Sequence, residues 1–70
     1  MRLDSTQVNE LIERLNKFLS QTPKSRQRVS DEIGITSFTL YKFRRKQPIS
    51  ERTFNKIKYY LDREETNGNN

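Results

Sequence analysis

KSRQRVSDEIGITSFTLYKFRRK, residues 24–46, is the stretch from which the fold of this 70-residue chain can be argued. Its pattern predicts two short helices joined by a turn at Gly34. Ser25 is a favourable N-cap for the first helix, and Val29 and Ile33 lie four residues apart on one face of it. A helix that ends in a left-handed residue favours glycine, so we expect Gly34 to have a positive φ.

The second helix of this stretch is predicted to span residues 37–46, with Thr36 as its N-cap. Leu40 and Phe43 recur at helical spacing and form its core face. At about 100° per residue, four other side chains form a stripe nearly opposite that face: Phe38, Tyr41, Lys42 and Arg45. Two aromatic rings and two cations on a solvated stripe suit the DNA major groove. Cations there meet phosphates and guanine edges, and apolar groups meet thymine methyls.

The net charge of the chain is concentrated in the same stretch. The whole chain carries +5. Within residues 24–46, seven basic residues outnumber Asp31 and Glu32 and give the full +5, whereas residues 1–23 and 47–70 each balance to zero. Such a concentration of positive charge on a small domain indicates a polyanion as partner.

The order of residues from Ser30 to Phe43 resembles the helix-turn-helix of the lambda-repressor/Cro-like family, which also includes POU-specific domains. The matching positions are a small residue, a glycine, an apolar turn residue and two core residues: Ser30, Gly34, Ile35, Leu40 and Phe43. The continuation from Gln47 to Leu61 resembles the family's next loop and helix. The chain departs from the family at Ser30, usually alanine, and at Arg26, often glutamine. The resemblance implies a lambda-repressor-like fold and a transcriptional regulator of phage or bacterial repressor type, with a eukaryotic POU-like module as an alternative.

Two longer helices are predicted on either side of these two. Asp4 and Ser50 can cap them, and Leu3 with Val8 and Ile49 with Phe54 are spaced as hydrophobic staples. Their apolar residues follow a 3.6-residue period: Val8, Leu11, Ile12, Leu15, Phe18 and Leu19 in the first, and Phe54, Ile57, Tyr60 and Leu61 in the last.

The predicted fold is therefore all-α, a compact bundle of four short helices at about residues 5–20, 25–33, 37–46 and 51–63. One domain is expected over residues 1–63. Residues 64–70 lack apolar side chains and are expected to form a disordered polar tail.

The composition argues against catalysis. The chain contains neither cysteine nor histidine, which removes the usual thiolate ligands, metal-binding imidazoles and general bases. We expect no enzyme activity, no metal or other cofactor, no small-molecule ligand and no membrane association, since no apolar run approaches the roughly 20 residues of a membrane span. The expected location is cytoplasmic and nucleoid-associated, or nuclear in a eukaryote.

These observations predict sequence-specific binding of double-stranded DNA through the helix at 37–46. The residues expected to contact bases are Ser37, Phe38, Tyr41, Lys42 and Arg45. Those expected to contact phosphates are Lys24, Arg26, Arg28, Arg44 and Lys46.

Two alternative functions stay open at this point. One is a protein-interaction module, such as an antirepressor or inhibitor, which would bind an acidic partner through Phe38, Tyr41 and Tyr59. The other is the DNA-targeting piece of a larger repressor or recombinase. The oligomeric state also stays open, and a homodimer is one of the states considered.

Overall fold

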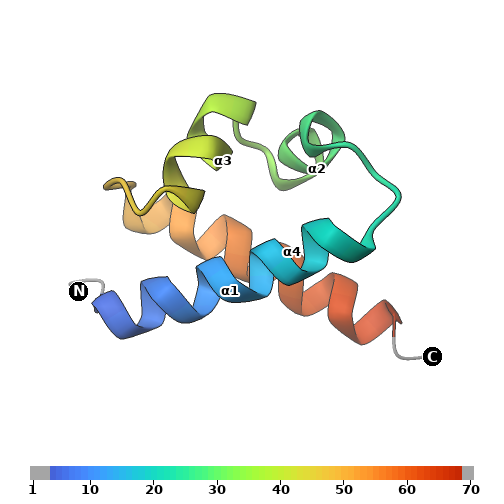
Figure 1. The fold of residues 1–70 in the computed structure, drawn as a ribbon, viewed down its shortest axis with the longest axis horizontal. Coiled ribbons are helices and arrows are strands. Elements are labelled where there is room, and N and C mark those ends of the chain that lie inside the picture. The colour runs from blue at the N-terminus through green and yellow to red at the C-terminus, as the bar shows by residue number, and fades with distance from the viewer. Residues whose placement is uncertain (1–3, 69–70) are drawn as a thin grey trace.

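Four helices and no strand make up residues 4–68, the part of the chain that the computed structural model describes. They are α1 Ser5–Gln21, α2 Arg26–Ile33, α3 Ser37–Arg44 and α4 Glu51–Gly68. The two long helices, α1 and α4, cross each other, and α2 and α3 lie together on one side of them (Figure 1). The predicted all-helical class and the order of four helices are confirmed.

Each helix begins at a polar side chain that accepts a backbone hydrogen bond. Asp4, Ser25, Thr36 and Ser50 accept from backbone N–H groups two or three residues further on, at distances of 2.9–3.1 Å. Caps of this kind contribute about 1 kcal/mol each, because they satisfy donors that have no partner inside the helix. All four predicted caps are confirmed, and they fix where the helices start.

The core lies where the apolar faces of the four helices meet. Its buried side chains are Leu11, Ile12, Leu15, Val29, Ile33, Leu40, Phe43, Phe54, Ile57, Tyr60 and Leu61. Two edge-to-face aromatic contacts cross between helices, Phe43 with Phe54 and Phe18 with Tyr60. Ser30 is also fully buried, and its hydroxyl donates to the Gln27 carbonyl at 2.8 Å, which satisfies the one polar atom it brings into the core.

The turn between α2 and α3 is built on Gly34. Its φ is +93°, in the left-handed region, as predicted. The N–H groups of Gly34 and Ile35 both donate to the Ser30 carbonyl, at 2.9 and 3.0 Å. The ammonium group of Lys56 on α4 donates to the Gly34 carbonyl at 3.3 Å. This short turn holds α2 and α3 in contact, with α3 at one edge of the molecule (Figure 1).

The end of α3 differs from the prediction. The helix stops at Arg44 rather than at residue 46, and Arg45 is its C-cap. Lys46 takes a left-handed conformation, with φ of 64°, and lets the Gln47 N–H reach back to the Lys42 carbonyl at 3.0 Å. This is the usual way to satisfy carbonyls at a helix end, but glycine normally occupies the left-handed position. The sequence pattern missed it because no glycine marks the site.

We therefore expect Lys46→Gly to stabilise the fold. The left-handed conformation costs a non-glycine residue about 1–2 kcal/mol, partly offset by the greater backbone entropy that glycine loses on folding, which leaves a gain of about 0.5–1 kcal/mol. Urea denaturation would measure it. Lys46→Ala is the control, since it removes the same charge but keeps the strain. An equal unfolding free energy for the two variants would contradict this account.

The C-terminal helix also runs further than predicted. α4 continues to Gly68, whereas a helix ending at 63 and a disordered tail from 64 were expected. That prediction is wrong for residues 64–68, because Glu64 and Glu65 find basic partners on other segments. The remainder of the predicted tail, 69–70, and Leu3 of the first staple lie outside the described residues. Within residues 4–68, no helix is long and apolar enough to cross a lipid bilayer.

Candidate nucleic-acid interface

The two faces of α3 are sharply different in exposure. Leu40 and Phe43 are buried, at 1% and 0% exposure, whereas Phe38 is 67% and Tyr41 52% exposed. This division follows from helix geometry, which turns positions 38 and 41 away from positions 40 and 43. Arg45 is exposed as well and Lys42 is half-buried, so the predicted stripe of α3, namely Phe38, Tyr41, Lys42 and Arg45, lies on the outer side of the helix. Phe38 is not part of the core.

The stripe consists of two paired units, each a ring and a cation. The Lys42 ammonium lies 5.6 Å from the centre of the Phe38 ring, and the Arg45 guanidinium carbon lies 5.4 Å from the centre of the Tyr41 ring. Both pairs are four residues apart, the spacing at which side chains meet on a helix. Neither cation forms an ion pair with a carboxylate among the side chains that the structure describes. Their charge is therefore available to an external anion or acceptor.

The basic side chains around the stripe fall into two groups. Arg26 and Lys46 are exposed, at the start of α2 and just after α3. Arg44 donates from its Nε to the Asn16 amide oxygen on α1 at 2.8 Å, which orients the guanidinium without neutralising it. Ser37, at the first position of α3, is exposed. The three basic side chains keep their charge, and Ser37 keeps its hydroxyl for hydrogen bonding. Both are properties that phosphate contact uses.

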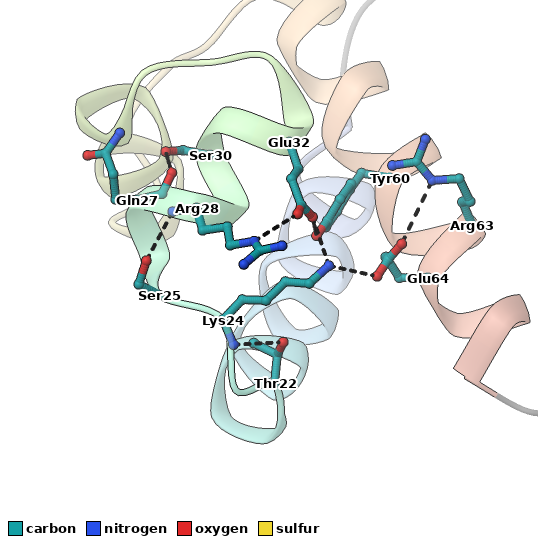
Figure 2. A network of polar contacts seen from close by, with 10 residues as sticks. All are labelled: Thr22, Lys24, Ser25, Gln27, Arg28, Ser30, Glu32, Tyr60, Arg63 and Glu64. Carbon is teal, nitrogen blue, oxygen red and sulfur yellow. Dashed lines mark hydrogen bonds and ion pairs between the residues drawn. The ribbon is translucent and has the colours of Figure 1, made fainter.

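Lys24 and Arg28 form the second group, because carboxylates within the fold hold them. The Lys24 ammonium lies 2.8 Å from Glu32 and 3.4 Å from Glu64, and Arg28 Nε lies 3.2 Å from the other Glu32 oxygen. Figure 2 shows these groups converging from α2, from α4 and from the connection that precedes α2. Predicted as phosphate contacts, Lys24 and Arg28 are weaker candidates than Arg26, Arg44 and Lys46, since their charge is locally balanced.

Tyr60 of α4 completes this polar network. Its hydroxyl donates to Glu32 at 2.7 Å, and burial together with that carboxylate raises the pKa of Tyr60 to about 12. The hydrogen bonds from Lys24, Tyr60 and Arg28 lower the pKa of Glu32 to about 2. Glu32 thus receives three donors, from α2, from α4 and from the segment before α2, and ties these segments together.

This network makes the fold acid-sensitive in a defined range. The Glu32 pKa is lower in the folded state than its ordinary value of 4.5, so its contribution is complete above about pH 5 and is lost as the pH falls toward about 2. We expect the melting temperature of the wild type to fall through this range more than that of Glu32→Gln, which cannot titrate at this position. Thermal melts from pH 6 to pH 2 would measure both. Parallel curves would show that Glu32 does not contribute.

Sequence reasoning did not find the long-range polar contacts. Besides the Glu32 network, Arg14 of α1 bonds Asp62 and Glu65 of α4. The contacts that reach α4 join residues between 28 and 51 positions apart, whereas Lys24 and Arg28 are eight and four positions from Glu32. The sequence offers two signals, the i, i+4 spacing of Arg28 and Glu32 and the acidic residues after Leu61, and the second does not say which basic residues they meet.

Comparison with protein-family models, with curated proteins and with solved structures gives no significant match.

Proposed function

We propose that this protein binds double-stranded DNA sequence-specifically through the stripe of α3, as a transcriptional regulator of repressor type. The observation that carries the proposal is the pair of exposed ring–cation units, Phe38 with Lys42 and Tyr41 with Arg45. Single exposed apolar residues are normal on a protein surface, but Phe38 and Tyr41 lie together on one face of α3. The two cations beside them point to a partner that is apolar in places and rich in hydrogen-bond acceptors.

The DNA major groove combines those two properties. It is about 12 Å wide and admits an α-helix, and its floor presents guanine O6 and N7 acceptors beside thymine methyl groups. α3 has eight residues, so it is about 12 Å long, and the turn at Gly34 attaches it at one edge of the molecule. We infer that α2 and α3 act as a helix-turn-helix of the lambda-repressor-like kind, with α3 in the groove.

Phosphate contacts would orient the domain on the duplex. Arg26 precedes the stripe in sequence, Lys46 follows it and Arg44 lies within it, and all three carry charge that no described carboxylate neutralises. Phosphate contacts of this kind supply affinity without sequence information, whereas Lys42, Arg45 and the rings would supply the discrimination between sequences. Ser37 can bond either a base edge or a phosphate.

Selection from a random duplex pool, followed by affinity measurements on variants, tests this function. Lys42→Ala and Arg45→Ala should each cost about 1–3 kcal/mol on the selected duplex and less on random DNA, because each removes a base contact. Stability should stay within about 1 kcal/mol of the wild type, because an exposed ring–cation contact contributes no more than that.

Lys17→Ala is the matched control for these two substitutions. Lys17 is an exposed cation on α1 and is not part of the stripe. Its loss should therefore change the affinity for the selected duplex and the affinity for random DNA by less than the stripe variants do. If both stripe variants discriminate between selected and random duplexes as well as the wild type does, α3 is not the reading element.

A protein-interaction module is the second candidate, favoured by the exposed rings of Phe38, Tyr41 and Tyr59. Tyr59 is on α4 and is 68% exposed. DNA is favoured over a protein partner because the two rings on α3 are each paired with a cation that has no described carboxylate partner. A pull-down on immobilised duplex DNA at rising salt separates the two, since only the first function predicts capture at low salt and release at high salt.

A further inference from the structure

We propose that the stripe of α3 selects a C5-methylated pyrimidine directly beside guanine, that is, a thymine–guanine or a 5-methylcytosine–guanine step. The proposal rests on the proposed function and specifies which duplexes that site prefers. Its basis is that each ring of the stripe is coupled to one particular cation, so that apolar surface and positive charge are presented together.

The chemistry of the stripe limits which bases it can read. Direct recognition of adenine normally uses asparagine or glutamine, and recognition of the cytosine amino group uses a carboxylate. The sequence of α3 and its cap, from Ser37 to Arg45, contains none of these four residue types. Its cations match the O6 and N7 acceptors of guanine, and its rings match the methyl group at pyrimidine C5.

The short distance between ring and cation within each unit indicates that the methyl group and the guanine they contact are close together on the DNA. In both units the cation lies 5.4–5.6 Å from the centre of its ring, so the two cannot contact base pairs that are far apart. Successive base pairs are about 3.4 Å apart, and the two units are three residues, or about 4.5 Å, apart along the helix. The separation within one unit is therefore more than one base step and less than two, and the adjacent base pair is the nearest position at which the ring can meet a methyl group while its cation meets a guanine.

The test uses two pairs of duplexes that differ only by the methyl group. The starting duplex is the sequence selected from the random pool. In the first pair the thymine of its thymine–guanine step is replaced by uracil, which keeps the base pair and removes the methyl. In the second pair the same step carries 5-methylcytosine or cytosine opposite guanine. We expect the methylated member of each pair to bind about fourfold more tightly, the value of one buried methyl-sized group.

Two variants assign the effect to the stripe. Phe38→Ala and Tyr41→Ala remove exposed rings, so both should keep the wild-type melting temperature to within a few degrees. The variant that loses the contacting ring should bind the two members of each pair equally. Tyr59→Ala is the matched control, because it removes an exposed ring on α4 that is not part of the stripe.

The outcomes separate this inference from the proposed function. A selected sequence without a thymine–guanine step, or equal binding of methylated and unmethylated members by the wild type, overturns the inference and leaves specific DNA binding in place. A methyl effect that persists in both ring variants overturns its assignment to the stripe. If the wild type binds no duplex, both proposals are overturned.

Discussion

Phe43→Ala is expected to destabilise the fold by about 3–5 kcal/mol. Phe43 is fully buried on the core face of α3, and its ring makes an edge-to-face contact with Phe54 of α4. The loss combines the hydrophobic transfer of the ring with the cavity that it leaves. A 70-residue domain has a total stability of about 4–10 kcal/mol, so this variant should be close to unfolding at 25 °C. Urea denaturation followed by circular dichroism measures the change.

Phe38→Ala is the matched control for this prediction. It is the same substitution on the same helix, five residues earlier, at a side chain that is 67% exposed. Its only described ring contact is with Lys42, and an exposed contact of that kind contributes about 0.5–1 kcal/mol. The two phenylalanines should therefore differ by at least about 2 kcal/mol. Equal destabilisation would mean that α3 presents a different face to the core.

DNA affinity is expected to fall steeply with salt. Phosphate contacts from Arg26, Arg44 and Lys46, together with the two stripe cations in the groove, are expected to displace about three to five counterions. At a slope of about −0.9 per contact, raising the salt from 50 to 200 mM should weaken binding by about 40- to 500-fold. Fluorescence anisotropy with a labelled duplex at four salt concentrations gives the slope. Affinity that is the same at both ends of this range would exclude a phosphate-based interface.

Lys46→Gly adds a control to the salt experiment, because it is expected to weaken DNA binding and to raise the stability of the fold. Loss of the Lys46 charge should reduce the salt slope by about one contact and weaken binding to all sequences alike. Relief of the left-handed conformation should at the same time raise stability. Weaker binding by a more stable protein cannot be attributed to unfolding.

Local features of this fold could be read from the sequence because they depend on neighbouring residues only. The caps at Asp4, Ser25, Thr36 and Ser50 and the positive φ of Gly34 follow from residue types at single positions. The left-handed Lys46 could not be read in this way, because its conformation is imposed by the helix that ends there and by the Gln47 hydrogen bond.

The length of α4 depended on contacts that only the folded chain brings together. The run after Leu61 lacks apolar residues, so a fraying tail was the reasonable expectation from local pattern alone. In the fold, Glu64 reaches Lys24 and Glu65 reaches Arg14, and these contacts support another turn of helix.

The candidate site shows the same division between local and long-range information. Helical angle alone put Phe38 and Tyr41 outside and Leu40 and Phe43 inside, and the structure confirms this. The ion pair between Lys24 and Glu64 depends on how α4 packs against the segment before α2, and it leaves Lys24 less available to an external anion. The assignment of individual side chains to bases and phosphates stays a prediction.

The most direct test of DNA binding through α3 is an NMR titration of the isotope-labelled chain with the selected duplex. Its readout is the change in the chemical shift of each backbone amide. The largest changes are expected between Ser37 and Lys46, around Phe38 and Tyr41, while the amide of Tyr59 on α4 stays nearly unchanged and serves as the internal reference. Changes centred on Tyr59, or a spectrum that the duplex leaves unaltered, would contradict the account.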